Sequence, residues 1–244
     1  MRTTTASSTA WRGTASCTAS GRSSRRGIFP RPKGRTVETA WLGEVAYREA
    51  LDLQLAYLDR RAIREIPDTL LLLTHPHVYT LGRAGDEANL LVPRETLAAE
   101  GIPVERVGRG GDITYHGPGQ LVGYPIVLME RPDVHRFVRS IEAALIDAVR
   151  AFGVESRRIE GLTGVWAGER KIASIGVGIR RWVTYHGFAL NVTTDLSRFR
   201  RIHLCGLKGR EATSIAEETG SAPTMEAVRE AVAAACNRHL EGFA

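Results

Sequence analysis

Apolar residues recur at helical spacing in three stretches of this 244-residue chain. The first stretch covers residues 46–64, where apolar positions fall three or four residues apart. The second begins after Pro132-Asp133, with Asp133 as its expected N-cap, and ends at Gly153. The third begins at Pro223-Thr224. The pattern therefore predicts helices near the start, the middle and the end of the chain.

Between these helices the chain is rich in short β-type segments separated by glycines. We predict strands over residues 69–74, 75–83, 104–107, 121–128, 154–159, 164–167, 171–179, 182–185 and 188–192. The spacing of the last five is typical of antiparallel hairpins. The sequence thus predicts an α+β fold, a mostly antiparallel mixed sheet flanked by helices, and we expect the helices on one face of the sheet.

The net charge of +6 is concentrated at the start of the chain. Residues 1–36 contain eight Arg or Lys residues and no Asp or Glu, so residues 37–244 carry a net charge of −2. This first segment also has too few large apolar residues to offset the entropy lost on ordering. We expect residues 1–36 to be a disordered basic extension and residues 37–244 to form one main domain, with a small lobe after residue 205 as an alternative.

Other interpretations of the extension stay open. Its Arg- and Ser-rich, acid-poor composition is also typical of an organelle transit peptide, and a misplaced start would add upstream sequence. An arm that binds nucleic acid is a weaker alternative, because the charges are dispersed. A transit peptide would place the protein in mitochondria; otherwise we expect a cytoplasmic protein.

The cysteines and histidines show neither a disulfide pattern nor a metal-site pattern. Three cysteines without paired spacing argue against a disulfide framework or a CxxC site and indicate a reducing compartment. The histidines lack HExxH spacing, so we expect no metal. No run approaches the roughly 18 apolar residues of a membrane span.

The stretch Arg109–Gln120 combines four glycines with a proline and several side chains that donate hydrogen bonds. Glycine is favoured where the backbone takes a positive φ or approaches another group closely. Paired glycines before Ile113-Thr114-Tyr115 indicate a backbone that presses against a bound ligand and then enters a strand. A plain glycine-rich turn before an apolar strand is the alternative.

Two ionisable residues have unusual local sequences. Cys205 lies in a glycine-rich, basic segment, and nearby positive charge stabilises a thiolate; a structural loop cysteine is the alternative. Lys171 begins an apolar strand, so it is either an exposed strand-end amine or a partly desolvated amine that exchanges protons near neutral pH. The simplest interpretation of His186 is a core histidine bonded to backbone, and His116 can be explained in the same way.

Four blocks resemble the lipoyl(octanoyl) transferases, enzymes with the biotin/lipoate ligase fold. They are residues 109–120, 171–176, 186–191 and 205–206, in the family's order, and the likeness extends from Val37 to the C-terminus. It implies that Cys205 carries the acyl group and that Lys171 is its base. It also implies that the acyl and pantetheine path is lined by Arg109, Gly110, Gly111, Asp112, Ile113, Thr114, Tyr115, His116, Ser174, Ile175, Gly176, Gly187, Phe188 and Ala189. Leu204 stands where the family usually has proline, which removes a fixed φ.

The resemblance implies an acyltransferase of lipoate biosynthesis and protein lipoylation. Such an octanoyltransferase moves an octanoyl group from octanoyl-acyl carrier protein, through a thioester on Cys205, to a lysine of lipoyl domains. The acceptors implied are the lipoyl domains of 2-oxoacid dehydrogenase complexes and the glycine cleavage H protein. We expect a monomer that uses no cofactor and binds neither nucleic acid nor membrane.

Two alternatives differ from this reading in their chemistry. An ATP-dependent lipoate or octanoate ligase on the same fold would keep a reactive lysine but would not need Cys205. A non-catalytic module that binds lipoyl domains or nucleic acid would need neither residue.

Basic residues near the proposed site suggest a docking rim for an acidic carrier protein. They are Arg180, Arg181, Arg198, Arg200, Arg201, Lys208 and Arg210; solvated surface arginines are the alternative. We also expect backbone N–H groups around Cys205-Gly206 and in the glycine-rich stretch to stabilise an oxyanion.

Overall fold

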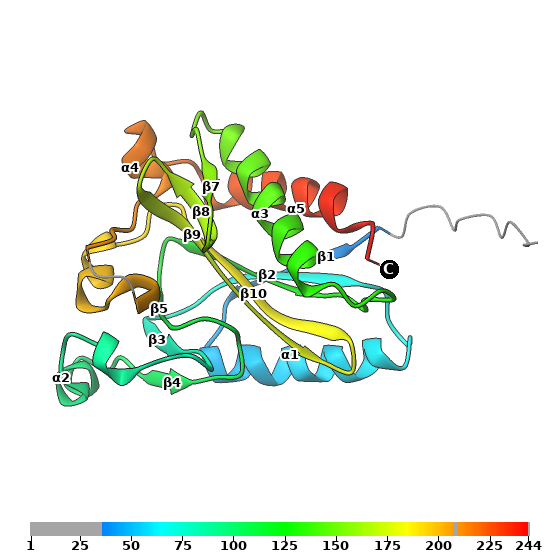
Figure 1. The fold of residues 1–244 in the computed structure, drawn as a ribbon, viewed down its shortest axis with the longest axis horizontal. Helices are drawn as coiled ribbons and strands as arrows, with labels where there is room; N and C mark the ends of the chain where they lie inside the picture. Colours follow the sequence, from blue (N-terminus) through cyan, green and yellow to red (C-terminus); the bar gives the residue numbers. More distant parts are fainter. Residues whose placement is uncertain (1–35, 207–208, 244) are drawn as a thin grey trace, which may run out of the picture. The chain divides into compact units, whose positions relative to one another are not determined.

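A seven-stranded sheet forms the centre of the protein (Figure 1). The structure is a computed structural model that describes residues 36–206 and 209–243, except for the side chain of Cys205. The strand order is β1-β2-β6-β10-β9-β8-β7, with β1 (Glu38–Glu44), β2 (Thr69–Thr74), β6 (Gln120–Ile126), β7 (Arg157–Ile159), β8 (Leu162–Ala167), β9 (Arg170–Arg180) and β10 (Val183–Asn191). Only β1 and β2 pair in parallel within this sheet.

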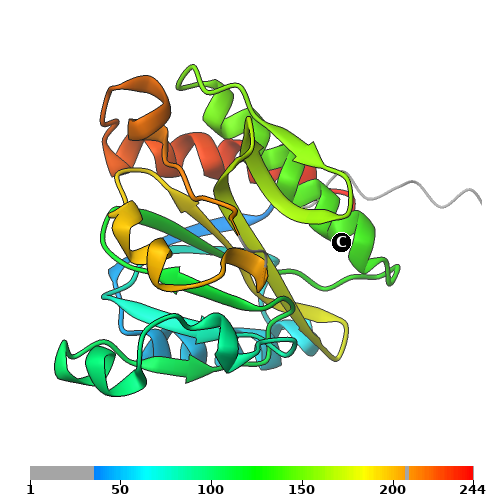
Figure 2. The ribbon, with the colours of Figure 1, turned by 60° about the vertical axis from the view of Figure 1, so that its left-hand side comes forward.

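Helices cover both faces of the large sheet, as Figures 1 and 2 show. Helices α3 (Val134–Arg150) and α5 (Met225–Leu240) pack on the face that includes Leu70 and Leu72. Helix α1 (Tyr47–Ala62) packs on the opposite face, against Leu71 and Leu73. The expectation of helices on one face is therefore wrong, although the α+β class is confirmed. Strand β2 is apolar at successive positions because both of its faces are buried.

A second sheet of three strands, β4-β3-β5, lies beside the first. Its strands are β3 (Val78–Leu81), β4 (Val104–Arg106) and β5 (Ile113–His116). The small helices α2 (Arg94–Ala99), η1 (Glu87–Asn89), η2 (Leu196–Arg201) and η3 (Leu204–Gly206) surround it, and α4 (Ile215–Thr219) precedes α5. Phe199 of η2 and Leu204 of η3 are buried with the side chains of this sheet.

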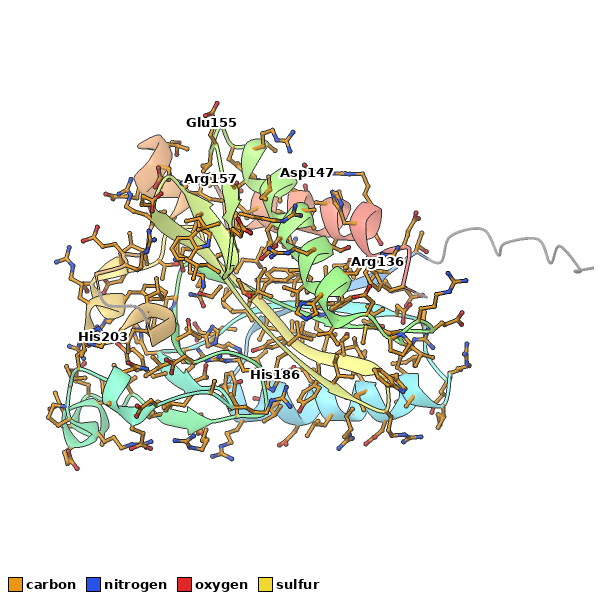
Figure 3. All side chains as sticks on the ribbon, viewed as in Figure 1. Arg136, Asp147, Glu155, Arg157, His186 and His203 are labelled. Atoms are coloured by element: carbon orange, nitrogen blue, oxygen red, sulfur yellow. The ribbon has the colours of Figure 1, made fainter. Side chains whose placement is uncertain are left out.

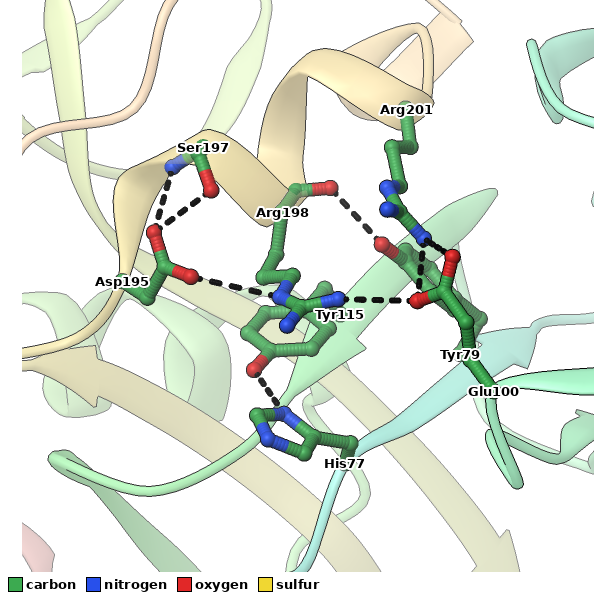
Figure 4. A network of polar contacts seen from close by, with 8 residues as sticks. All are labelled: His77, Tyr79, Glu100, Tyr115, Asp195, Ser197, Arg198 and Arg201. Atoms are coloured by element: carbon green, nitrogen blue, oxygen red, sulfur yellow. Dashed lines mark hydrogen bonds and ion pairs between the residues drawn. The ribbon is translucent and has the colours of Figure 1, made fainter. Parts of the chain in front are cut away.

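A polar network holds η2 against the small sheet (Figure 4). The Tyr79 hydroxyl donates to the carbonyl oxygen of Arg198 over 2.8 Å. The guanidinium groups of Arg198 and Arg201 both pair with Glu100, at 3.1 and 2.8 Å. The segment that leads to Cys205 is thus fixed to β3 and to the end of α2.

Strand β10 runs without interruption where two strands were expected. Gly187 lies inside it and pairs with Gly176 of β9, so the glycine marks a close approach and not a break. Helix α5 and Phe243, both after position 205, also belong to the main core, since the Phe243 ring contacts the Phe137 ring of α3 at a centroid distance of 5.2 Å. Within the described part of the chain, no helix combines the length and apolar character needed to cross a bilayer.

Candidate active site

A cavity of about 490 Å³, counting the space at its open mouth, lies between the two sheets. Most of the residues expected to line the acyl path lie in the wall of this cavity. The wall consists of Arg109, Gly111, Asp112, Ile113, Thr114, His116, Lys171, Ser174, Ile175, Gly176, Gly187, Phe188 and Ala189, with Tyr47, Tyr124 and His186 in addition. Strand β5 and its preceding loop supply one side, and β9 and β10 supply the other.

Two of the expected residues lie behind the wall. Gly110 donates its backbone N–H to the carbonyl oxygen of Val177 over 2.9 Å and so anchors the loop to β9. Tyr115 points to the other side of β5, where its hydroxyl lies 2.6 Å from His77 Nδ1. Strand alternation explains the second case, because successive side chains point to opposite faces.

Sequence reasoning did not assign Tyr47 or Tyr124 to the site. Both residues fall within apolar periodic runs, so the helix and strand patterns absorbed them. Their hydroxyl groups were the available signal, because a tyrosine on a buried face needs a partner for its polar end. Burial raises the pKa of Tyr47 to about 12, so its phenol stays protonated at neutral pH.

Lys171 lines the cavity and is buried, with 2% of its surface exposed. Its backbone N–H donates to the carbonyl oxygen of Glu211, and its own carbonyl accepts from the N–H of Thr213, both over 2.9 Å. Its ammonium nitrogen lies 5.2 Å from the centroid of the Trp166 ring. The interpretation as an exposed strand-end lysine is therefore wrong.

The side chain of Cys205 lies outside the described residues, so its distance from Lys171 remains a prediction. The backbone around it is described. His203 N donates to Asn89 O over 2.8 Å, and a Cβ placed on Gly206 would lie 2.6 Å from Asp112 Oδ2. Because Asp112 lines the same cavity as Lys171, the residue that follows Cys205 contacts the cavity wall.

Leu204 takes the place of the family's usual proline and is 2% exposed. Its side chain packs with Tyr79 and Phe199 under the small sheet. Core packing of Leu204 therefore holds the start of η3, a position where a proline would fix φ through its ring.

The glycine-rich loop is held by its own side chains. The Arg109 guanidinium donates to the carbonyl oxygen of Thr80 over 2.6 Å and to the hydroxyl of Thr80 over 2.9 Å. The Asp112 carboxylate accepts from the backbone N–H of Ile113 over 2.7 Å. A Cβ on Gly176 would lie only 2.7 Å from Gly110 O, so this close approach of loop and strand requires glycine.

Two of the amides expected to stabilise an oxyanion are already engaged. The N–H of Gly110 donates to Val177 O, and the N–H of Gly206 donates to His203 O, both over 2.9 Å. Either amide would have to leave its present acceptor before it could bind an oxyanion.

Two histidines, His116 and His186, line the cavity, and the ring of His75 lies against that of His116 at a centroid distance of 5.7 Å. The side-chain amide nitrogen of Gln120 donates to Tyr115 O over 3.1 Å, so its oxygen faces His116 Nδ1 at 2.8 Å and that nitrogen carries the proton. His75 Nδ1 lies 2.6 Å from Val45 O and its Nε2 lies 2.7 Å from the Tyr124 hydroxyl. His116 and His75 are therefore core histidines with partners.

Burial keeps these rings neutral. It lowers the pKa of His75 to about 4, that of His186 to about 3, and that of His116 well below its ordinary value. The nearby Arg109 charge acts in the same direction on His116 and His186. The ring nitrogens of His186 have no hydrogen-bond partner among the described residues, so the interpretation as a histidine satisfied by backbone is wrong.

The basic residues do not form a single rim. Arg180 and Arg181 lie at the β9–β10 turn and pair with Asp59 of α1. Arg198 and Arg201 lie in η2, on the opposite side of the ribbon in Figure 1. Lys208 lies outside the described residues. Within residues 36–204 and 209–243, no group of three or more His, Cys, Asp or Glu is placed to hold a metal ion.

Comparison with known proteins agrees with this geometry. Residues 46–237 match the family model of the lipoyl protein ligase A/B catalytic domain. An octanoyltransferase from Geotalea uraniireducens is 48% identical over 204 residues, covering 83% of this chain and 92% of the relative. One from Solibacter usitatus is 52% identical over 177 residues, covering 72% and 80%.

The fold also matches solved structures. A putative lipoate protein ligase from T. acidophilum with bound lipoic acid aligns with a TM-score of 0.66 at 18% identity, over 84% of this chain and 86% of that one. Lipoate-protein ligase A bound with ATP aligns with a TM-score of 0.67 at 18% identity, over 84% and 85%. At this identity the likeness shows the biotin/lipoate ligase fold alone. With the family model and the sequence relatives, the chain belongs to the lipoyl protein ligase A/B catalytic-domain family, among its octanoyltransferases, and it is an acyltransferase of protein lipoylation.

Proposed function

We propose that the protein transfers an octanoyl group from octanoyl-acyl carrier protein to a lysine of lipoyl domains, through a thioester on Cys205. The observation that carries the proposal is the buried Lys171 in a cavity whose wall includes Asp112, which in turn contacts Gly206. This arrangement supports a lysine base close to the residue that would be acylated. Acceptors of this kind are the lipoyl domains of 2-oxoacid dehydrogenase complexes and the glycine cleavage H protein.

The first half-reaction forms the acyl-enzyme. The amine of Lys171 takes the proton of the Cys205 thiol, and the thiolate attacks the thioester carbonyl of the carrier-bound octanoyl group. The bond from the carbonyl carbon to the pantetheine sulfur breaks, and Lys171 returns its proton to the departing sulfur. A thiolate suits this exchange because thioester interchange is close to energetically even.

The second half-reaction releases the product. The neutral amine of the acceptor lysine attacks the Cys205 thioester, forms the amide and expels the Cys205 thiolate. The attacking nitrogen must lose a proton, and Lys171 or the thiolate can accept it. Cys205 and Lys171 then return to their starting protonation states.

The cavity also suits a fatty chain. Ile175, Phe188 and Ala189 supply apolar surface on β9 and β10. Burial contributes about 0.8 kcal/mol per methylene, so an eight-carbon chain gains several kcal/mol of binding. Because one methylene changes affinity by only a few-fold, the depth of the cavity must help to select the chain length.

Intact mass spectrometry of the full chain after mixing with octanoyl-acyl carrier protein tests the proposal. We expect a gain of one octanoyl group that maps to Cys205, and no gain in the Cys205→Ser variant. Adding a lipoyl domain should remove the group from the enzyme and place it on the acceptor. An ATP-dependent ligase would instead form an acyl-adenylate and would remain active after Cys205→Ser, which would overturn the acyl-enzyme mechanism.

A further inference from the structure

The carboxylate of Glu142 is buried beside β8, the strand that pairs with the start of β9 at Lys171. We infer that Glu142 is a positioning residue for acyl transfer: it fixes the backbone of β8 at Gly164, and Gly164 in turn holds the side chain of Lys171 in place. The inference rests on the proposed function in one respect, since it takes Lys171 to be the base. Three observations carry it.

The first observation is the burial of Glu142 within α3. The residue is 0% exposed, and a buried carboxylate is costly unless it is paired and hydrogen-bonded. Its Oε2 is paired with the guanidinium groups of Arg139 and Arg158, at 2.7 and 2.9 Å. Both arginine side chains remain accessible to solvent, at 50% and 40%. These ion pairs could therefore form at the surface, and they do not explain why the carboxylate is buried.

The second observation is the partner of the other carboxylate oxygen. Oε1 of Glu142 accepts the buried backbone N–H of Gly164 over 3.1 Å. This bond joins α3 to β8, which lie side by side in Figures 1 and 3, near the labelled Arg157 of β7. A register shift interrupts the pairing of β8 with β9 between Val165 and Trp166. Glu142 thus supplies an acceptor for a buried N–H close to a break in the strand ladder, and so fixes the backbone there.

The third observation is the contact between Gly164 and Lys171. A Cβ placed on Gly164 would lie 2.4 Å from Lys171 Cε and 3.0 Å from Lys171 Nζ, so the end of the lysine side chain packs against the glycine backbone. A shift of β8 at Gly164 would therefore move the amine. Because a shift of about 1 Å in a reacting group can cost about 100-fold in rate, the bond from Gly164 to Glu142 bears on catalysis.

Two substitutions of Glu142 separate its reach from its charge. Glu142→Asp keeps the charge for the two arginines but is one methylene shorter, so it withdraws the acceptor from Gly164. Glu142→Gln loses the charge but keeps the length and one acceptor oxygen. We expect that oxygen to stay on Gly164, because the buried N–H cannot turn to water, whereas the half-exposed guanidinium groups can.

Single-turnover acylation of the full chain by octanoyl-acyl carrier protein, followed by mass spectrometry, tests the inference. Glu142→Asp should be acylated at least about tenfold more slowly than the wild type, and Glu142→Gln within about threefold of it. Glu142 does not line the cavity, so calorimetry should give octanoate affinities within about twofold of the wild type in both variants. A Glu142→Asp rate no lower than that of Glu142→Gln, or a loss of octanoate affinity as large as the loss of rate, would overturn the inference.

Arg139→Met is the matched control, because it removes one ion pair of Glu142 and leaves the bond to Gly164. Its acylation rate should stay within about twofold of the wild type, even if its thermal stability falls as far as that of Glu142→Asp. An equal loss of rate in these two variants would mean that general destabilisation explains the effect.

A second measurement needs no acyl transfer. The lysines of this chain are Lys33, Lys171 and Lys208, so protein labelled with carbon-13 at lysine Cε gives few NMR signals, and Lys171→Met identifies that of Lys171. The Trp166 ring, whose centroid lies 5.2 Å from Lys171 Nζ, should shift this signal through its ring current. We expect the shift to persist in Glu142→Gln and to change in Glu142→Asp. An unchanged signal in Glu142→Asp would overturn the inference.

These readouts also decide the matter if Glu142→Asp does not fold. In that case a changed Lys171 signal in Glu142→Gln, or acylation of that variant more than about threefold slower than the wild type, overturns the inference.

The proposed function can fail separately. A Lys171 signal that changes in Glu142→Asp, together with normal acylation of Lys171→Met, would refute Lys171 as the base and leave Glu142 as the residue that positions it. Acylation on Cys205 that depends on Lys171, with an unchanged signal in Glu142→Asp, would do the reverse.

Discussion

Two residues of the cavity wall, Lys171 and His186, are equally buried and differ in what surrounds them. Lys171 is 2% exposed and His186 is 1% exposed. Lys171 lies at the start of regular strand β9, with backbone hydrogen bonds to Glu211 and Thr213 and its ammonium group over an aromatic ring. His186 lies on a strained backbone, with a neutral ring between tyrosines.

Burial alone therefore does not assign a role to either residue. An ionisable amine in the cavity wall is suited to proton transfer, whereas a ring that burial keeps neutral is suited to binding. Substitutions of Lys171 should therefore lower the rate of acyl transfer. Substitutions of His186 should alter the affinity for the acyl chain.

Replacing the lysine should have the largest effect. We expect Lys171→Met to slow acylation by octanoyl-acyl carrier protein about 10²- to 10⁴-fold, the usual contribution of a general base. Single-turnover kinetics followed by mass spectrometry would measure it. The neighbouring Arg170→Met removes a charge that faces Glu218 and serves as the matched control, with near-normal rates expected. A Lys171→Met rate above a tenth of the wild-type rate would show that Lys171 is not the base.

A smaller displacement of the lysine should have an intermediate effect. A Cβ at Gly164 would lie 2.4 Å from Lys171 Cε and 2.6 Å from the carbonyl oxygen of Ala173, so Gly164→Ala must displace the lysine side chain and also shift the backbone of β8 or β9. A shift of about 1 Å in a reacting group can cost about 100-fold in rate. Gly164 has a φ of +128°, so the variant should also be less stable.

Gly168→Ala is the control for the loss of stability that a positive φ causes when alanine replaces glycine. Gly168 also has a positive φ, of +56°, but its Cβ would meet nothing within 4 Å. It should lose about 1 kcal/mol of stability at unchanged activity. Equal acylation rates in the two variants, with both proteins folded, would argue that the position of Lys171 is not critical.

The neutral histidine rings beside the cavity predict a weaker effect, a pH dependence of stability. The pKa of His75 falls to about 4 on folding, from 6.5, so the unfolded chain binds more protons between these values. Stability is complete above pH 6.5 and decreases as the pH falls toward 4. By linkage, His75 alone should remove about 2 kcal/mol between pH 7 and pH 5.

Urea unfolding at the two pH values would measure the effect. His75→Gln should lose less stability than the wild type over this interval, by about the same 2 kcal/mol. His135→Gln, at an exposed position on α3, should keep the wild-type slope. An identical slope in His75→Gln would mean that the ring can be protonated without penalty, contrary to its burial.

Local structure followed closely from local sequence. Asp133 caps α3, accepting from Arg136 N over 2.9 Å, and Thr224 caps α5 in the same way over 3.2 Å. The predicted strand over residues 69–74 has the observed bounds. These features depend on capping residues and side-chain periodicity within a few positions of one another. Both can be recognised directly in the sequence.

Part of the candidate site could also be predicted from the sequence. Resemblance supplied the glycine-rich loop, the strand of Lys171 and the segment Gly187–Ala189, and the structure brings these segments to one cavity. The same comparison of motifs could not find Tyr47 or Tyr124, because each fits its own helix or strand pattern. Whether Cys205 Sγ reaches Lys171 Nζ stays a prediction.

The order of the strands in the sheet determined the features that the sequence did not predict. The pairing of β10 with β6, and of β6 with β2, joins residues more than forty positions apart and exposes both faces of the large sheet to helices. Helical and strand periodicity describe one element at a time, so they contain no information on which elements become neighbours. The helices on both faces, the two tyrosines in the wall and the unpartnered ring of His186 all arise from that long-range pairing, because a face acquires its neighbours only when the sheet has formed.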